Sequence, residues 1–231
     1  SPGVVVYMNE VPLPSAITLW QQGGPGNFLD LQNMQVLAGP QGTLFGRNTT
    51  GGAVLVTPKK PTDEFGGWLQ GTIGNYDARV IEGAVNLPVV SDKLMVRVAG
   101  AYNDRDGYTR DVVWNKDRDD QHWYSGRIGI LFRPTERIEN YTMVYGSRSS
   151  NNGAGLVHKQ FNIDGLKAFG LCSDAPGAGA GSCDVYRAVS AQANARGPRQ
   201  TGFSIDTFSE TESWGVSNTT DFELNDELKL R

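Results

Sequence analysis

The sequence is poor in cysteine and histidine and contains no long hydrophobic segment. Only two of its 231 residues are cysteine and two are histidine. Uninterrupted apolar runs, such as Val4–Tyr7 and Ala53–Val56, are far shorter than the roughly 18 residues that a membrane-spanning helix needs. The sequence therefore contains no candidate for a transmembrane helix.

The sequence also lacks the motifs of a catalytic or metal site. Neither His122 nor His158 has a cysteine or a second histidine at metal-ligand spacing, and no residue lies in a nucleophile motif. The glycines of Gly42–Gly46 have neither the spacing nor the lysine of a phosphate-binding loop. We therefore predict no catalytic residue, no resident metal, no cofactor and no enzymatic activity.

Charge gives no sign of a nucleic-acid partner. The 21 basic and 25 acidic residues give a net charge of −4, and both signs are interspersed along the chain. One cluster of acidic residues comprises Asp104, Asp106, Asp111, Asp117, Asp119 and Asp120. Its spacing does not match an EF-hand loop, so we expect a solvated loop, with a divalent-cation site as the alternative.

The two cysteines, Cys172 and Cys183, enclose a run of small and turn-forming residues. Because no histidine or further cysteine lies near them, a zinc site would lack ligands. We expect a local disulfide formed in an oxidising compartment, and two free thiols are the alternative.

Glycine is plentiful, and the pattern of the chain changes near residues 58–61. Glycine accounts for 29 residues and aromatics for 10% of the sequence, which disfavours a helical bundle. Before this point, short apolar pieces alternate with glycine-rich turns, as in a small mixed domain. After it, apolar and polar residues alternate with a period of two, which predicts β-strands. These segments lie near residues 64–75, 81–87, 94–103, 127–133, 141–148 and 213–224.

The connections between these strands favour a membrane barrel, and an ordinary soluble sheet is the alternative. Tight turns at 88–92, 134–137 and 225–227 alternate with long connections at 104–120 and 149–211, as in outer-membrane barrels. The one exception is the first hairpin, at 75–77, which is short although it lies on the side of the long connections. We expect one face of each strand to contact lipid and the other to line the lumen. The predicted lipid-facing residues are Ile81, Val85, Val96, Val98, Ile128, Ile130, Tyr141 and Val216, and the predicted lumen-facing residues are Glu82, Arg97 and Arg127.

The run from Phe28 to Pro61 resembles the late part of the plug domain of TonB-dependent outer-membrane receptors. The resemblance is carried almost without gaps by this run, which includes Val36-Leu37-Ala38-Gly39-Pro40 and Leu44-Phe45-Gly46-Arg47. Residues 4–13 look like the plug strand of the family, and residues 94–107 look like an early barrel strand.

The resemblance implies a mainly β chain. Residues 1–62 would form the C-terminal part of a small α+β plug domain, and residues 63–231 the N-terminal antiparallel strands of a transmembrane β-barrel of roughly 22 strands. It implies a receptor of the bacterial outer membrane that takes up a scarce nutrient complex, most often a ferric siderophore. Its partners would be outer-membrane lipid and the TonB energy-coupling complex. A non-transporting outer-membrane or secreted β-sheet protein for binding or adhesion is the alternative.

In the family, the connection before Phe28 points toward the extracellular mouth of the barrel, which implies a ligand contact there. We predict this contact at Trp20, Gln21, Gln22 and Asn27, which offer a stacking face and neutral hydrogen-bonding groups. The alternative is a mobile loop whose tryptophan packs against the barrel wall.

The resemblance also bears on how the plug is held in the barrel. Arg47 is the predicted plug–barrel contact, because an arginine can pair with carboxylates of the lumen. The family usually has an acidic residue and an arginine where this chain has Gln35 and Ala38, so we expect the usual charge pairing to be altered.

The sequence has several features of a fragment. It opens at Ser1, and six strands cannot close around a plug, so we expect the TonB box, the first half of the plug and further strands to be missing. We expect the Cys172–Cys183 pair on the extracellular side, within a long connection. The glycosylation sequons that begin at Asn48, Asn140 and Asn218 are expected to be chance matches in a bacterial protein.

Overall fold

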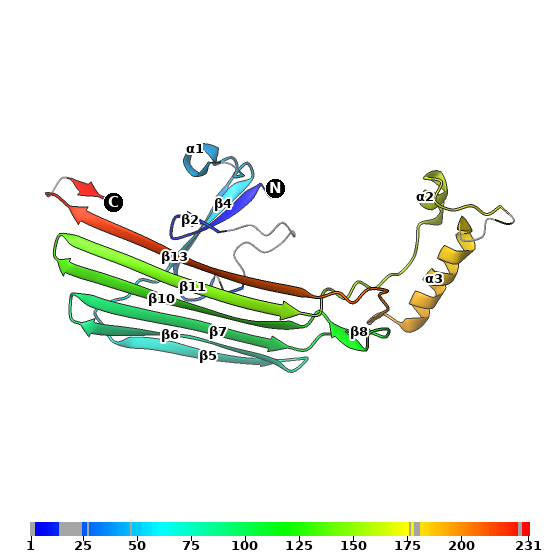
Figure 1. The fold of residues 1–231 in the computed structure, drawn as a ribbon, viewed down its shortest axis with the longest axis horizontal. Coiled ribbons are helices and arrows are strands. Elements are labelled where there is room, and N and C mark those ends of the chain that lie inside the picture. Colours follow the sequence, from blue (N-terminus) through cyan, green and yellow to red (C-terminus); the bar gives the residue numbers. More distant parts are fainter. Residues whose placement is uncertain are drawn as a thin grey trace. The chain divides into compact units, whose positions relative to one another are not determined.

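The computed structural model describes residues 3–13, 25–26, 28–46, 48–175, 177, 181–225 and 228–231, and it is mainly β (Figure 1). The chain forms two compact units. The first, called here the wall-and-plug unit, comprises Ser1–Asp104, His122–Ser150 and Glu210–Arg231; the second, the loop unit, comprises Arg105–Gln121 and Asn151–Ser209. Within the described part of the chain, no helix is long and apolar enough to cross a membrane.

The wall-and-plug unit begins with a small mixed sheet, the plug segment. Its strands are β1 (Val4–Met8), β2 (Val11–Pro12), β3 (Leu31–Ala38) and β4 (Gly52–Pro58), in the order β2-β1-β4-β3, with helix α1 (Gly42–Phe45) between β3 and β4. β1 runs parallel to β4, and β3 runs antiparallel to it. At Gly52 the two neighbouring strands approach closely, because a Cβ there would lie 2.4 Å from the carbonyl oxygen of Leu37.

The second sheet of this unit, the wall, has the strand order β14-β13-β11-β10-β7-β6-β5. Its strands are β5 (Gly66–Gly74), β6 (Ala78–Val90), β7 (Leu94–Arg105), β10 (Gln121–Thr135), β11 (Ile138–Asn151), β13 (Ser209–Glu223) and β14 (Lys229–Leu230). The pairs β5–β6, β6–β7, β10–β11 and β13–β14 are antiparallel. Tight turns follow β5, β6 and β10, and Tyr76, Asp77 and Asp92 adopt the positive φ angles that such turns need. The antiparallel strands predicted from the alternating pattern are confirmed.

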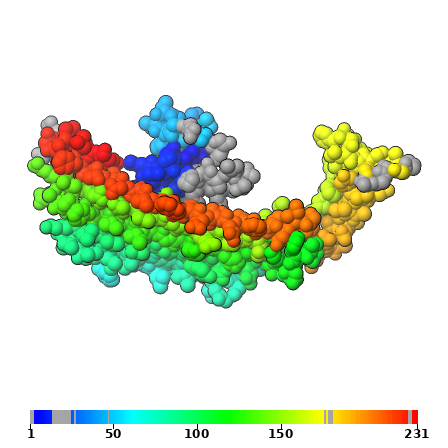
Figure 2. All heavy atoms as spheres, viewed as in Figure 1, coloured from blue at the N-terminus to red at the C-terminus, as the bar shows by residue number. Residues whose placement is uncertain are grey.

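The plug segment packs on one face of the wall (Figure 2). A buried apolar cluster joins the two sheets. It consists of Met8 and Leu13 from the plug segment and Met95, Leu131, Tyr141 and Met143 from the wall. Burial of these side chains supplies the hydrophobic part of the contact between plug and wall.

The predicted faces of the wall strands are confirmed for most residues. Arg97 and Arg127 are buried beneath the plug segment. Ile81, Val98, Ile128 and Val216, which alternate with the inward-facing residues of their strands, are exposed on the opposite face. The period-two pattern therefore assigns the two faces of β6, β7, β10 and β13 correctly.

The prediction that Tyr141 faces lipid is wrong. Tyr141 is only 3% exposed and packs against the plug segment. Its β10 partner is Leu131, and Tyr145 on the same face pairs with the plug-facing Arg127. The reason is that the plug segment presents the apolar side chains of Met8 and Leu13 opposite Tyr141, so the face of β11 that packs on the plug segment is apolar there.

The described residues of the loop unit form a small sheet and two helices. The sheet consists of β8 (Thr109–Asp111), β9 (Lys116–Arg118) and β12 (Gln200–Thr201), and the helices are α2 (Ile163–Ala168) and α3 (Cys183–Arg196). The side chain of Asn162 caps the start of α2, and that of Ser182 caps the start of α3. The alternating pattern predicted residues 149–211 as one long connection, and it contains no signal for α2, α3 and β12.

The acidic cluster is not the solvated loop that we expected. Asp111 is fully buried and pairs with the equally buried Arg118, whose Nη2 lies 2.7 Å from the Asp111 carboxylate and 3.1 Å from that of Asp206. Burial by itself would raise the pKa of Asp111, but hydrogen bonds from Arg118 and from backbone N–H groups lower it. Arg118 therefore ties residues 105–121 to residues 151–209 within the loop unit. Among the described residues, no group of acidic, histidine or cysteine side chains is placed to hold a metal ion.

Candidate functional site

The contact between plug segment and wall is centred on the carboxylate of Asp30. Arg97 donates two hydrogen bonds to it, from Nε at 2.7 Å and from Nη2 at 2.6 Å. Trp68 donates a third from its indole Nε1 at 3.1 Å. The Asp30 and Arg97 side chains are only 3% and 6% exposed, so the pair is shielded from water.

A second wall arginine holds the backbone on both sides of this carboxylate. Arg127 Nη2 donates to the carbonyl oxygens of Leu29, at 2.7 Å, and Asp30, at 2.9 Å. The same nitrogen lies 3.8 Å from the Asp30 carboxylate. We call Asp30, Arg97 and Arg127 the plug lock, because two neighbouring wall strands grip one residue of the plug through it.

Charge and burial together determine the ionisation of the lock. Burial by itself would raise the pKa of Asp30, but the hydrogen bonds from Arg97 and Trp68 and the two arginine charges outweigh it, so the pKa is lowered. The lock therefore contains one negative and two positive groups. Removing the carboxylate would leave two buried cations without a counter-ion, which is costly in a shielded site.

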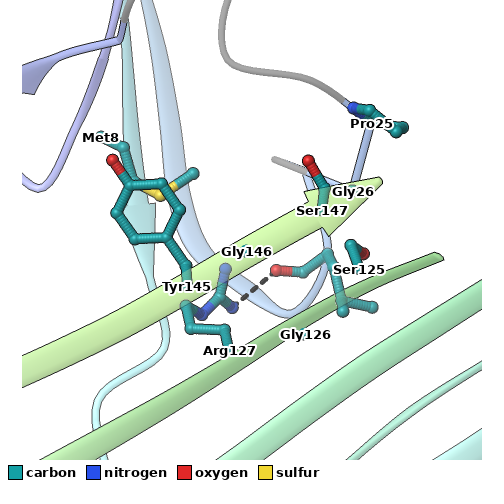
Figure 3. A pocket seen from close by; sticks show the side chains of 10 residues that line it. Met8, Pro25, Gly26, Ser125, Gly126, Arg127, Tyr145, Gly146 and Ser147 are labelled. Atoms are coloured by element: carbon teal, nitrogen blue, oxygen red, sulfur yellow. Dashed lines mark hydrogen bonds between the residues drawn. The ribbon is translucent and has the colours of Figure 1, made fainter. Parts of the chain in front are cut away.

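A small cavity adjoins the lock between plug and wall (Figure 3). Its volume is about 10 Å³, and Met8, Gly26, Ser125, Arg127 and Tyr145 are among the residues that line it. This volume is close to the minimum for a single water molecule. The described part of the plug segment thus packs closely against the wall at this cavity.

The segment that leads from the plug to the wall is also held along its length. Asn86 of β6, which is 2% exposed, accepts a hydrogen bond from Thr62 N at 3.0 Å and donates to the carbonyl oxygens of Thr62, at 2.8 Å, and Glu64, at 2.5 Å. One side chain thereby satisfies three backbone groups of the segment Lys59–Glu64, which we call the linker.

Ion pairs hold the other side of the linker. Lys60 Nζ lies 3.1 Å from the Glu139 carboxylate of β11. Arg133 of β10 bonds Glu139 at 2.9 Å and lies 3.7 Å from Asp63. Together with Asn86, these contacts attach the linker to three wall strands, so it is a fixed connection.

The residues predicted for ligand contact and plug locking lie outside the described residues. These are Trp20, Gln21, Gln22, Asn27 and Arg47. Gln35 and Ala38 lie on β3, where they pair with Leu55 and Gly52 of β4.

The period-two pattern predicted that Arg97 and Arg127 face the lumen, but it identified no partner for either side chain. Asp30 lies inside the stretch that resembles a plug domain. The sequence therefore contained a signal for the plug lock, namely an acidic residue in the plug-like stretch and two arginines on the inward face of the wall strands. Their pairing depends on residues 67 or more positions apart, which periodicity alone does not connect.

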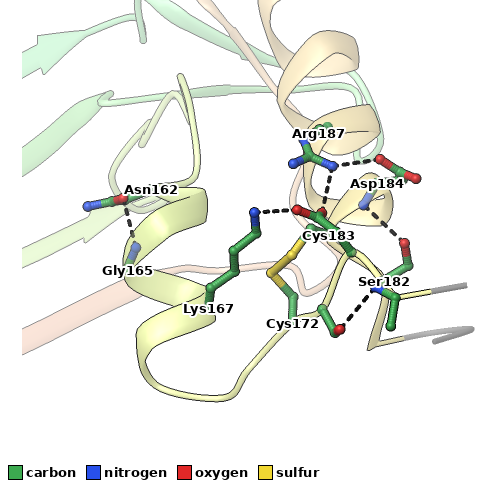
Figure 4. The surroundings of a disulfide bond; sticks show 11 residues. Asn162, Gly165, Lys167, Cys172, Ser182, Cys183, Asp184 and Arg187 are labelled. Carbon is green, nitrogen blue, oxygen red and sulfur yellow. Dashed lines mark hydrogen bonds and ion pairs between the residues drawn. A yellow bond between two sulfur atoms is a disulfide. The ribbon is translucent and has the colours of Figure 1, made fainter.

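The predicted cysteine pair lies in the loop unit, where Cys172 and Cys183 are joined by a disulfide (Figure 4). Asp174, between them in sequence, forms ion pairs with Lys167 of α2 and Arg187 of α3. The hydrogen bonds from these two cations lower the pKa of Asp174. The disulfide and the ion pairs thus link the segment between α2 and α3 to both helices.

Comparison with known proteins identifies receptors of similar sequence and fold. No protein-family profile matches the chain. The pesticin receptors of Yersinia enterocolitica and Yersinia pestis are 30% identical to it over 78 residues, which is 34% of this chain and 11% of those receptors. The chain thus spans only a small part of the length of the curated relatives that it matches.

Solved structures of FyuA and Fiu are similar to almost the whole chain. The ferric yersiniabactin uptake receptor FyuA of Yersinia pestis matches with a TM-score of 0.71 and 16% identity over 96% of this chain and 30% of FyuA. The ferric-catecholate import receptor Fiu of Escherichia coli K12 matches with a TM-score of 0.65 and 17% identity over 96% of this chain and 29% of Fiu.

The matched proteins are receptors. At this level of identity the structural matches show the fold, and the chain has the fold of part of a TonB-dependent receptor.

Proposed function

We propose that the receptor containing this chain takes up a ferric siderophore across the outer membrane, driven by the TonB energy-coupling complex. Residues 1–62 serve as the C-terminal part of its plug and residues 63–231 as barrel strands. The observation that carries this proposal is the plug lock, in which Asp30 is buried against Arg97 and Arg127 of the wall. In this proposal the plug closes the lumen of the complete barrel, so transport requires that the lock or the plug sheet rearrange.

The comparisons support iron uptake as the transport class. FyuA and Fiu are named for the uptake of ferric siderophores, and a further structure with the same fold is the ferripyoverdine receptor of Pseudomonas aeruginosa. The chemical identity of the cargo depends on contacts at the extracellular mouth. We assign Trp20, Gln21, Gln22 and Asn27 to these contacts, because an aromatic face and neutral amides suit a large polar ligand.

An uptake experiment tests the proposal directly. The gene is deleted in its Gram-negative host, and entry of radioactive iron is measured from a panel of ferric siderophores with and without a functional TonB protein. We expect one siderophore to lose TonB-dependent uptake in the deletion strain and to regain it with the full-length receptor. Binding of the cargo to cells without any TonB-dependent entry would instead indicate a non-transporting binding protein.

A further inference from the structure

The outward face of the wall carries a small polar cluster. Asn140 and Thr142 lie on β11, and Asn218 and Thr220 lie on β13. Each alternates with buried residues that face the plug, so all four lie on the opposite side of the sheet. The two strands therefore present the same Asn-x-Thr pattern toward the surface that contacts lipid in a membrane barrel.

The four side chains form a closed hydrogen-bond network. Asn140 Nδ2 donates to Asn218 Oδ1 at 3.1 Å and to Thr220 Oγ1 at 2.7 Å. Asn218 Nδ2 donates to Asn140 Oδ1 at 3.1 Å and to Thr142 Oγ1 at 2.7 Å. The hydroxyl of Thr142 donates back to Asn140 at 3.1 Å, and that of Thr220 to Asn218 at 3.5 Å. All side-chain donors of the cluster thus find acceptors inside it.

The cluster is flanked by apolar side chains. Ile130 and Phe132 are its neighbours on β10, and the exposed Val216 and Phe222 flank it on β13. In hydrocarbon, an unsatisfied polar group is costly because no water is available to bond it. A network that satisfies its own donors avoids this cost, so the cluster is stable on a lipid-facing surface without a partner molecule.

The cluster lies between two strands, β11 and β13, whose register is not fixed by a short turn. In a hairpin, the length and type of the turn fix the register of the two strands. β5–β6, β6–β7 and β10–β11 have such turns, but β11 and β13 are joined by the whole segment from Asn152 to Phe208. A connection of this length cannot fix the register, so side-chain contacts between the strands must do so.

We propose that Asn140, Thr142, Asn218 and Thr220 form a register clasp that selects the pairing of β11 with β13. A slip of one residue would turn every side chain of β13 to the opposite face. A slip of two residues would keep the faces but leave only one residue of each Asn-x-Thr sequence opposite the other, so the full network could not form. The clasp therefore discriminates against the slip that hydrophobic patterning alone tolerates. On the plug side, Ser147 Oγ lies 2.9 Å from Ser213 Oγ in the same register.

Cysteine cross-linking in the full-length receptor in the outer membrane tests the clasp. In a Cys172→Ala/Cys183→Ala background, Ser147→Cys with Ser213→Cys reports the native register, and Ser147→Cys with Thr211→Cys reports a slip of two residues. The clasp is removed with Asn140→Ala/Asn218→Ala. The matched control is Ser150→Ala, an exposed residue of the same face of β11.

We expect the control to form only the native cross-link and the Asn140→Ala/Asn218→Ala variant to lose native cross-link while the slipped cross-link appears. If that variant does not assemble, Thr142→Val/Thr220→Val removes part of the network, and the same ratio of cross-links is measured. Unchanged cross-linking in the assembled variant overturns the proposal. So does the dissociation of a receptor dimer with the native register intact, because the cluster would then be an interface between two copies.

Discussion

Asp30 of the plug segment and Arg97 of the wall form a buried, bidentate ion pair with N–O distances of 2.6 and 2.7 Å. The pair joins a residue just before β3 to the first part of β7, and Arg127 of the neighbouring strand β10 donates to the backbone carbonyl of Asp30. Because both strands belong to the wall, this single residue fixes the position of the plug segment against two wall strands at once.

Replacement of Asp30 by Asn is expected to loosen the plug. The substitution leaves Arg97 and Arg127 buried without their counter-ion, which costs about 3–5 kcal/mol for a buried pair. Limited proteolysis of the full-length receptor in native membranes should then cleave the plug faster. The matched control is Asp77→Asn, which removes the carboxylate of the exposed Asp77–Arg79 pair in a turn of the wall. Equal cleavage rates in the two variants would contradict the role of the lock.

Because of the plug lock, the stability of the plug should also depend on pH in strong acid. The pKa of Asp30 is lowered from its ordinary value of 3.8, so its stabilisation is fully present above pH 3.8 and is lost as pH falls through the lower pKa of the folded state. Hydrogen exchange of plug amides should therefore be insensitive to this group near neutral pH and should accelerate only in strong acid. The Asp30→Asn variant should not show this acceleration of exchange in acid. If the variant showed the same acceleration, other titrating groups would be responsible for it.

Replacement of Asn86 by Ala is expected to release the linker. The substitution removes three hydrogen bonds to the linker backbone, each worth about 1 kcal/mol, and leaves buried backbone groups unpaired. A cysteine at Thr62 should then react faster with a thiol reagent added to permeabilised cells. Asn103→Ala is the control, since the Asn103 Oδ1 has no hydrogen-bond partner among the described residues.

The Cys172–Cys183 bond should be present on the surface of intact cells. Because the two sulfurs are bonded, a thiol reagent added to intact cells without reductant should label neither cysteine, and labelling of both after reduction should show that they face outward. Loss of the bond should cost the loop unit about 2–3 kcal/mol in the chain-entropy description, which faster proteolysis of residues 172–183 would reveal. Quantitative labelling of both thiols before reduction would refute the bond.

Replacement of Trp20 by Ala is expected to weaken cargo binding. Loss of a stacked aromatic side chain and its buried area costs about 1–3 kcal/mol, or roughly tenfold to a hundredfold in affinity. Binding of the ferric siderophore to whole cells is measured at matched surface expression, with Trp214→Ala on the outward face of the wall as the control. Unchanged affinity would remove Trp20 from the binding site.

The sequence by itself determined the strands and most of their faces. A period of two is a local property, so alternation assigned Arg97 to one face of β7 and Val98 to the other without knowledge of any partner. The turn residues after β5 and β6 likewise carry their own backbone preferences. The resemblance of residues 28–61 to a plug domain indicated what the wall encloses.

The tertiary structure alone decided which faces meet and which charges pair. Alternation shows that β11 has an apolar face, but Tyr141 turns inward because Met8 and Leu13 of the plug lie opposite it. The plug lock and the clasp between Asn140 and Asn218 join residues separated by long stretches of chain. Such pairs depend on how the strands assemble, and the energy that selects them comes from burial and from hydrogen bonds that no local pattern contains.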